Sequence, residues 1–244
     1  MNKPVLGVLG GVGPLATAYF MKTVIQKTPA SCDQENIPMI VFNDPQIPDR
    51  TAHILDRTSP DPTPEMVRVA RWLEEAHADY LAIPCNTAHY FYEAIQESVR
   101  IPVLNIIQET TEEIIRRLGT GATVGILATQ GTVSSGVFQD YLTDRGLKTV
   151  VPDEHGQSQV MSLIYDKVKA GHITDAHELV ELAEILHNRG CDAVVSGCTE
   201  LSVLYQELDD DSRPGWLIDS MDVLAERCVQ VYMTEHEPTK GPGA

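Results

Sequence analysis

Two cysteines stand in matching surroundings in the two halves of this chain. Cys85 follows the apolar run 80–83, and Cys198 follows the run 193–195. In each case an Asp lies six residues before the cysteine, and small or polar residues come directly after it. This pattern is typical of a buried strand that delivers a thiol to the start of a helix. Two equivalent thiols that face one cleft can remove a proton from one face of a substrate and return a proton to the other face.

Both cysteines are expected at a ligand-binding edge, because parallel sheets bind ligands at the carboxyl ends of their strands. A helix N-terminus also favours a thiolate, since the helix dipole and the free N–H groups stabilise negative charge. We therefore predict that Cys85 and Cys198 each lie at a helix start as reactive groups. A lone cysteine is more often a packing residue, which is our interpretation of Cys32, Cys191 and Cys228.

The elements that would position the two thiols alternate between strand and helix. Apolar runs predict strands at 5–9, 39–42, 80–83, 103–106, 122–127 and 216–218, and helical spacing predicts helices at 15–27, 65–77, 87–99 and 109–118. The interval from Gly7 to Cys85 is 78 residues and that from Gly125 to Cys198 is 73, so the second half repeats the first. The repeat predicts an α/β fold of two similar, pseudo-symmetric domains with parallel sheets flanked by helices.

The same repeat suggests where the domains begin and end. We expect a first domain of residues 1–106 plus 216–235, because the last strand and helix would return to pack on the first half. Residues 107–215 would form the second domain. Residues 236–244, rich in Pro and Gly, are expected to be a disordered tail.

The composition limits the possible partners. The chain has 18 basic and 35 acidic side chains and a net charge of −17, which argues against nucleic acid and anionic membranes as partners. No apolar run approaches the roughly 20 residues that a membrane span needs. The five cysteines are odd in number and scattered, so we interpret them as thiols in a reducing cytoplasm rather than as a disulfide framework. We therefore expect a cytoplasmic enzyme that acts on a small molecule.

Several stretches of the chain together match one known family. They are the glycine loop 7–14 with Ala16 and Thr17, then 48–51, 84–89, 125–129, 169–171 and 197–201. In this order they resemble the cofactor-independent aspartate/glutamate racemase family, and in particular its aspartate racemase branch. The resemblance implies two similar domains with the active site in the cleft between them, no pyridoxal phosphate or other cofactor, no metal, and commonly a homodimer. It implies a racemase of L- and D-aspartate in which Cys85 and Cys198 act as acid and base.

Two basic residues are expected to contact the substrate on the basis of this resemblance. Arg50 lies in the family's Pro-Asp-Arg motif and would hold the side-chain carboxylate of aspartate with two hydrogen bonds. Lys169 matches the family's second basic residue near the site. From the residues alone, Arg50 could instead pair with Asp49 or Asp44, and Lys169 could be a solvated helix end.

A further set of residues is expected at the substrate because of its position beside the cysteines and in the first loop of each half. Asn86, Thr87 and Thr199 could donate hydrogen bonds to the α-carboxylate. Glu200 would orient local groups or act as a helix-start carboxylate. His89, one helical turn beyond Cys85, could bond near the thiolate or be an ordinary helix histidine. The loop residues in this set are Gly11, Thr129, Gln130 and Thr132.

Other interpretations of the same residues stay open. The loop 11–16 satisfies the loose Gly-x-Gly-x-x-Ala pattern of dinucleotide-binding proteins, although Asp44 lies further along the chain than the usual acidic partner. Cys85, His89 and Cys198 could form a zinc site, but no metal-binding spacing supports one. Related scaffolds isomerise maleate or racemise hydantoins, and the substrate could also be glutamate or a broader set of amino acids.

Overall fold

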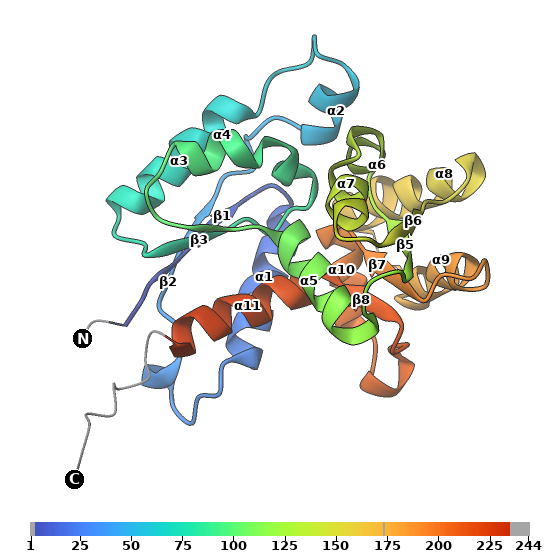
Figure 1. Cartoon of the computed structure of the whole chain (residues 1–244). Helices are drawn as coiled ribbons and strands as arrows, with labels where there is room; N and C mark the ends of the chain where they lie inside the picture. Colours follow the sequence, from blue (N-terminus) through green and yellow to red (C-terminus); the bar gives the residue numbers. More distant parts are fainter. Residues whose placement is uncertain (1–2, 173, 235–244) are drawn as a thin grey trace.

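Two parallel sheets with the same strand order form the centre of the computed structural model, which describes residues 3–172 and 174–234. The first sheet has the order β2-β1-β3-β4 and the second has the order β6-β5-β7-β8. Figure 1 shows β1 to β3 and β5 to β8 in separate parts of the molecule. The strands are β1 (Leu6–Gly10), β2 (Met39–Asn43), β3 (Tyr80–Ala82), β4 (Val103–Leu104), β5 (Thr123–Leu127), β6 (Lys148–Val150), β7 (Ala193–Ser196) and β8 (Leu217–Asp219). The predicted α/β fold with two similar parallel sheets is confirmed.

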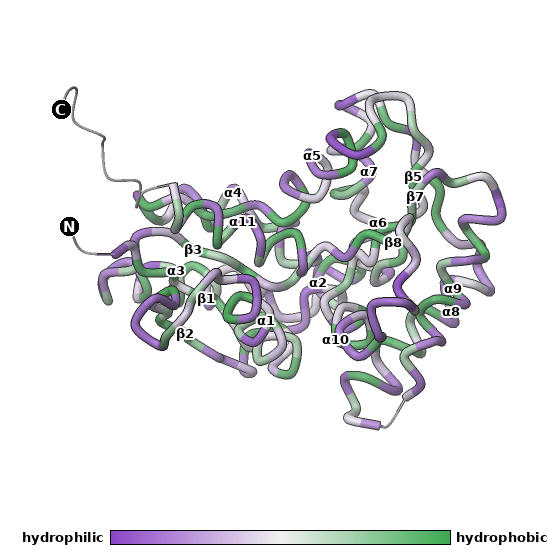
Figure 2. The backbone as a smooth tube through the Cα atoms, turned by 90° about the horizontal axis from the view of Figure 1, so that it is seen from below, coloured by the Kyte–Doolittle hydropathy of each residue, from purple (hydrophilic) through white to green (hydrophobic). Residues whose placement is uncertain are grey.

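Helices follow the strands and cover both faces of each sheet. This explains why β1 and β5 are continuous apolar runs rather than alternating ones. In Figure 2 the helix tubes alternate between hydrophobic and hydrophilic segments, as expected of helices that pack one face on a sheet. The α-helices are α1 (Pro14–Lys27), α2 (Arg50–Leu55), α3 (Thr63–Glu75), α4 (Tyr92–Glu97), α5 (Ile106–Leu118), α6 (Gln130–Ser135), α7 (Val137–Asp144), α8 (Glu154–Ser162), α9 (His177–His187), α10 (Thr199–Glu207) and α11 (Ser220–Thr234). The other helical segments are η1 (Asp33–Glu35), η2 (Thr87–Phe91), η3 (Leu163–Lys169) and η4 (Asp210–Ser212).

The repeated aspartates tie together the two inner strands of each sheet. The carboxylate of Asp79 accepts a hydrogen bond from the Val5 N–H at 2.7 Å, and that of Asp192 accepts one from the Thr123 N–H at 2.8 Å. In return, the N–H of each aspartate donates to the carbonyl of the same partner residue. β3 is thereby fixed beside β1, and β7 beside β5, in the same way in both halves. Each of these strands then carries its cysteine to the same end of its sheet.

The final helix of each half packs against the other half. Helix α11 lies against α1 and α5, and α5 lies against α7; Figure 1 shows α11 (red) returning to the first half. The strand before α11 does not return with it, because β8 pairs with β7, with Asp219 opposite Ser196. The expectation that the whole segment 216–235 joins the first domain is therefore wrong for this strand. The expected tail at 236–244 lies outside the described residues.

The helix expected over 65–77 is α3, which starts and ends two residues earlier, and the other two differences lie in the first turns of the helices expected over 87–99 and 109–118. The helix expected over 87–99 is the 3-10 helix η2 followed by α4, because the His89 ring bonds to the Cys85 carbonyl in place of an α-helical N–H. Helix α5 starts at Ile106, three residues earlier than expected, because the Asn105 side chain caps it by accepting from the N–H groups of Ile107 and Gln108. Among the described residues, no helix has the length and apolar character needed to cross a bilayer.

Candidate active site

Cys85 and Cys198 line one cavity between the two halves. Cys85 comes three residues after β3 and Cys198 two residues after β7, at equivalent strand ends. The cavity is narrow, with a volume of about 10 Å³, and both halves form its wall. The lining residues are Val12, Asp49, Arg50, Thr51, Cys85, Asn86, Thr87, Thr129, Tyr165, Lys169, Cys198, Thr199 and Glu200. The structure thus brings together nine of the predicted site residues and leaves out Gly11, Gln130 and Thr132.

Cys198 is a protonated thiol in this arrangement. It is the N-cap residue of α10, as expected, and its Sγ donates a hydrogen bond to Oε2 of Glu200 at 3.0 Å. Burial raises the pKa of the Cys198 thiol well above its ordinary value, and the adjacent Glu200 carboxylate raises it further. Burial and the first-turn carboxylate therefore oppose the preference of a helix start for a thiolate at Cys198.

Lys169 balances the charge of Glu200. Its Nζ lies 3.6 Å from Oε1 of Glu200 and 4.0 Å from Oδ2 of Asp49. Burial, the largest single influence, lowers the pKa of Lys169, but Glu200 together with Tyr165 and Cys198 outweighs burial and raises this pKa above its ordinary value. Lys169 is therefore a charged member of the cavity wall rather than a solvated helix end. Glu200 is itself buried, so the pair needs its close geometry to offset the loss of water.

Three polar residues of the wall are absent from the predicted site, namely Asp49, Thr51 and Tyr165. The Tyr165 hydroxyl donates to Oδ2 of Asp49 at 3.2 Å, which links the second half to the first. Lys169 Nζ lies 4.5 Å from the centre of the Tyr165 ring. Each had a signal in the sequence, because Asp49 and Thr51 flank Arg50 in its motif and Tyr165 precedes Lys169 by one helical turn.

Arg50 is a buried cation with no carboxylate partner among the described residues. One terminal nitrogen, Nη1, donates to the carbonyls of Ile47 at 3.2 Å and Pro48 at 2.9 Å. Its Nε is buried and has no hydrogen-bond partner within the described part of the chain. Neither of the alternative pairings holds, since Asp44 bonds to Arg68 and Asp49 to Tyr165. Arg50 is therefore available to bind an anion in the cavity.

A cluster of threonine hydroxyls closes one side of the cavity. Thr87 Oγ1 lies 3.0 Å from that of Thr129 and 2.9 Å from that of Thr132. Thr51 Oγ1 donates to Thr129 Oγ1 at 3.2 Å, so the cluster joins α2, η2 and the start of α6. Thr132 stands behind Thr129 in this cluster rather than at the cavity wall. Gln130 points elsewhere, because its amide donates to the Ser134 hydroxyl.

The side chains of Asn86 and Thr199 are already engaged as donors. Asn86 Nδ2 donates to Ser220 Oγ at 2.9 Å, and the Thr199 hydroxyl donates to the Pro84 carbonyl at 3.0 Å. The Thr199 hydroxyl has a single proton, so in this conformation it cannot also donate to the α-carboxylate, whereas the Asn86 amide has a second N–H and its donor role stays a prediction. The first backbone N–H groups of a helix have no partner within the helix, so those of α10 are better placed to bind a carboxylate.

The His89 side chain is part of the framework beneath Cys85. Its Nε2 accepts from the Ile106 N–H at 3.2 Å, so Nδ1 carries the proton and donates to the Cys85 carbonyl at 2.9 Å. Burial lowers the pKa of His89 to about 4, which keeps the ring neutral. Both ring nitrogens are thus occupied, and the zinc site considered above does not form from this conformation. Within the described residues, no group of three or more His, Cys, Asp or Glu side chains is arranged to hold a metal ion.

The glycine loop is shaped by contacts within the protein. A Cβ on Gly11 would lie 2.2 Å from the backbone of Asp44, and one on Gly13 would lie 2.6 Å from Oε1 of Glu200. Both glycines are therefore explained by the close approach of Asp44 and Glu200. They do not by themselves indicate a binding site for a dinucleotide pyrophosphate. Asp44, the candidate ribose ligand, pairs with Arg68 at 2.8 Å. Gly11 lines an outer groove that meets the cavity at Asp49, Arg50, Lys169 and Glu200.

The sequence pattern of the Asp/Glu/Hydantoin racemase family matches residues 9–228. The chain belongs to this family. Membership accords with the two thiols at equivalent strand ends and with the paired sheets. The enzyme is therefore an isomerase of the cofactor-independent amino-acid racemase type.

Individual members of the racemase family resemble the chain over nearly its whole length. A broad specificity amino-acid racemase, RacX of Bacillus subtilis, is 29% identical over 236 residues, covering 93% of this chain and 98% of the relative. The solved structure of Picrophilus torridus aspartate racemase has a TM-score of 0.81 and 29% identity, and the match covers 94% of each chain. Glutamate racemase of Francisella tularensis, solved with D-glutamate, has a TM-score of 0.63 at 19% identity over 99% of this chain and 86% of its own. This last likeness shows the shared fold.

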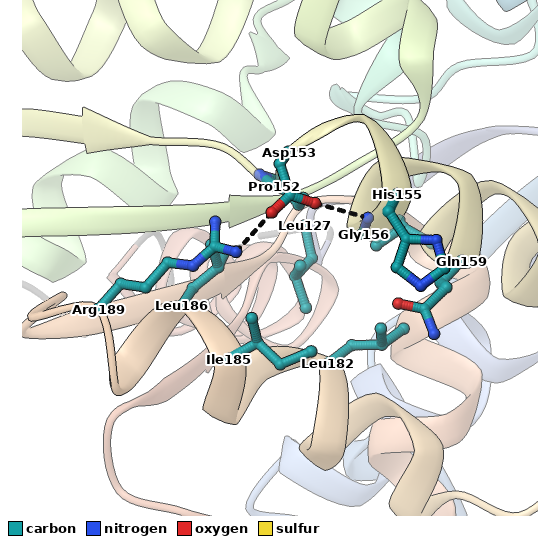
Figure 3. Close-up of a pocket in the computed structure, with 11 residues that line it drawn as sticks. Leu127, Pro152, Asp153, His155, Gly156, Gln159, Leu182, Ile185, Leu186 and Arg189 are labelled. Carbon is teal, nitrogen blue, oxygen red and sulfur yellow. Dashed lines mark hydrogen bonds and ion pairs between the residues drawn. The ribbon is translucent and has the colours of Figure 1, made fainter.

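A second hollow in this racemase-family enzyme lies between α8 and α9, outside the cavity just described (Figure 3). Apolar side chains such as Leu182 and Ile185 form part of its wall. Its carboxylate is already bound, because Asp153 accepts from the Gly156 N–H at 2.9 Å and from Arg189 at 2.6 Å. Because Asp153 and Arg189 are paired with each other, neither is free to bind a ligand, and we assign the hollow no function.

Replacing Glu200 by glutamine is expected to make Cys198 more reactive in this racemase-family enzyme. The change removes a negative charge that raises the pKa of Cys198 and leaves Lys169, whose charge lowers it. The thiolate fraction at pH 7.5 should rise about tenfold for each unit by which the pKa falls. The rate of alkylation of Cys198 by iodoacetamide, followed by peptide mass spectrometry, measures this fraction. The exposed Cys32 gives an internal reference rate, and an unchanged ratio of the two rates would contradict the role of Glu200.

Asp219 makes the stability of the enzyme dependent on pH. It caps α11 by accepting from the Asp222 N–H at 2.8 Å, and burial raises its pKa to about 7. The folded state therefore holds the proton of the Asp219 carboxyl more tightly than the unfolded chain does. The stability of the folded state that depends on this proton is fully present below about pH 4 and is lost as the pH rises through 7. Asp219→Asn should remove this loss of stability. It is expected to raise the free energy of unfolding at pH 8 by about a few kcal/mol and to have little effect at pH 4.

Urea unfolding of both proteins at pH 4, 6 and 8 measures this effect. The exposed Asp211→Asn variant is the matched control and should show no such pH-dependent difference from the wild type. Equal stabilities of wild type and Asp219→Asn at every pH would show that the Asp219 carboxyl titrates as it does in the unfolded chain.

Proposed function

We propose that this enzyme interconverts L- and D-aspartate by a two-base mechanism and needs no cofactor. The observation that carries the proposal is the pair of cysteines at equivalent strand ends in the wall of one cavity, with the proton of Cys198 held by Glu200. A thiol and a thiolate on opposite sides of Cα are the groups that an inversion at this carbon requires.

In the proposed reaction, the Cys85 thiolate removes the α-proton from one face of the substrate. The electron pair of the broken C–H bond passes into the α-carboxylate, and Cys198 gives its proton to the opposite face of Cα. Cys85 ends as the thiol and Cys198 as the thiolate, so the other enantiomer reacts by the same steps in reverse. Lys169 offsets the charge that Cys198 then carries, because its Coulombic influence lowers the pKa of this thiol.

The negative charge that develops on the α-carboxylate needs fixed donors in a site closed to water. The backbone N–H groups at the start of α10 are the donors we assign to it, together with the hydroxyl cluster around Thr87 and Thr129. Both cysteines are buried, with exposed fractions of 6% and 4%, so bulk water is excluded from the reacting atoms.

Arg50 supports an acidic substrate. It is a buried guanidinium with an unpartnered Nε, and a side-chain carboxylate of aspartate would supply the missing acceptor. Glutamate or a broader set of amino acids is the second candidate, favoured by the outer groove. This groove has a volume of about 540 Å³, is partly apolar through Leu15, Ile47 and Val168, and shares Arg50 with the cavity. As in the racemase family at large, we expect a homodimer, and we place the enzyme in the cytoplasm.

Exchange of the α-proton in D₂O tests the proposal. Purified enzyme is incubated separately with L-aspartate, L-glutamate, L-alanine, maleate and a 5-substituted hydantoin, without added cofactor, and followed by ¹H NMR and chiral chromatography. Loss of the α-proton signal of L-aspartate together with formation of the D-enantiomer is the expected result. Conversion of maleate to fumarate, or racemisation of the hydantoin alone, would replace the proposal with one of those activities.

A further inference from the structure

A chain of hydrogen bonds links the reaction cavity to the second half of the protein through Ser220. Asn86 follows β3 in the first half, and its Nδ2 lies 2.9 Å from Ser220 Oγ, at a separation of 134 residues in the sequence. Ser220 Oγ lies 2.8 Å from the carbonyl oxygen of Ser196, the last residue of β7. The side chains of Asn86 and Ser220 and the whole of Ser196 are almost completely buried, so water does not compete for these bonds.

The number of protons available to Asn86, Ser220 and Ser196 fixes the direction of each hydrogen bond between them. A carbonyl oxygen can only accept, so the single hydroxyl proton of Ser220 goes to Ser196. Ser220 Oγ must then accept from its other neighbour, which means that the amide group of Asn86 presents its NH₂ and not its oxygen to Ser220. The orientation of the Asn86 amide thus follows from the hydrogen-bonding chemistry of its partners.

The other end of the Asn86 amide is left without a partner inside the site. Its Oδ1 is buried, has no hydrogen-bond partner among the described residues, and belongs to a side chain that lines the cavity with both cysteines. A buried acceptor in this position is costly unless a ligand supplies a donor. The α-ammonium is the strongest donor of an amino-acid substrate, whereas the carboxylates of the substrate can only accept.

We infer that Ser220 is a positioning residue of this enzyme: it holds the Asn86 amide with Oδ1 towards the cavity, where that oxygen receives the α-ammonium of the substrate. The inference rests on the proposed amino-acid substrate. Ser220 acts through Asn86 and does not itself touch the substrate. Because Asn86 belongs to the first half and Ser220 to the second, the site selects ammonium only when the two halves are correctly docked.

The inference predicts a selective effect of Ser220→Ala on ligands that carry an ammonium group. Without the hydroxyl acceptor, the amide can rotate and present its NH₂ to the cavity, where it repels the ammonium. Binding of DL-aspartate should weaken about tenfold or more, as expected for the loss of one hydrogen bond to a charged group. Succinate has the same two carboxylates and no ammonium, so its dissociation constant should change less than about twofold.

Isothermal titration calorimetry with DL-aspartate and with succinate measures both constants in the full-length wild type and the variants. Ser220→Thr keeps the hydroxyl acceptor and should restore the wild-type ratio of the two dissociation constants. Ser202→Ala removes another fully buried serine hydroxyl, on α10 of the same half, and should leave the ratio unchanged. Thermal unfolding of each variant shows whether it is folded.

Equal weakening of aspartate and succinate by Ser220→Ala would overturn the inference, because general damage to the site has that effect. No weakening of either ligand, or no binding of aspartate to the wild type, would also overturn it. Racemisation of aspartate is assayed in parallel on the same samples. Aspartate that binds with the predicted dependence on Ser220 but is not racemised would refute the proposed function and leave the inference standing.

Discussion

Cys85→Ala and Cys198→Ala are each expected to slow the interconversion of L- and D-aspartate by about 10³-fold or more. Each change removes one member of the proposed acid–base pair, and a positioned general acid or base contributes about 10²- to 10⁴-fold to a rate. The thiol that remains still reaches Cα from its own side. We therefore expect each variant to retain slow α-proton exchange with D₂O in one enantiomer, without inversion, and the two variants to prefer opposite enantiomers.

NMR exchange with each pure enantiomer, combined with chiral chromatography, separates exchange from inversion. Cys32→Ala and Cys228→Ala are the matched controls, because one thiol is exposed and the other is buried away from the cavity. Both controls are expected to keep the wild-type rate. Inversion that survives the loss of either Cys85 or Cys198 at more than a tenth of the wild-type rate would exclude the two-thiol mechanism.

The duplicated architecture was predictable because its signals are local. Asp79 and Asp192 stand at the same distance before their cysteines, and each ties its strand to the first strand of the same half. Apolar runs then indicate the strands themselves. The assignment of residues 216–219 failed because strand pairing depends on contacts far apart in the sequence. A short apolar segment such as Leu217–Asp219 carries no mark of which sheet it joins.

The members of the site were more predictable than their states. Motif positions indicated nine of the residues that line the cavity, among them Cys198 and Glu200. The protonation of Cys198 depends on how the Glu200 side chain turns back within one helical turn, which spacing does not reveal. The orientation of the Asn86 amide depends on Ser220, a residue that has no motif and lies 134 positions away. Donor and acceptor roles of this kind follow only from the complete set of neighbours.

Arg50→Lys is expected to lower kcat/KM for aspartate by about 10²-fold while changing kcat/KM for alanine much less. Lysine keeps the positive charge but loses the planar pair of donors that matches a carboxylate, and one to two charge-assisted hydrogen bonds of about 1.5–3 kcal/mol each are at stake. Steady-state kinetics with both substrates give the ratio that reports side-chain recognition. Arg68→Lys is the matched control, because Arg68 pairs with Asp44 outside the cavity and should leave the ratio unchanged.

The comparison between substrates also separates recognition from stability. Arg50 donates to the carbonyls of Ile47 and Pro48, so its replacement disturbs the loop before α2 and can lower activity through loss of structure. Such a loss would reduce kcat/KM for aspartate and alanine by the same factor. An equal reduction would therefore remove Arg50 from side-chain recognition and, with it, the main support for an acidic substrate. A selective reduction, with the fold intact by thermal unfolding, would place the side-chain carboxylate against this buried guanidinium.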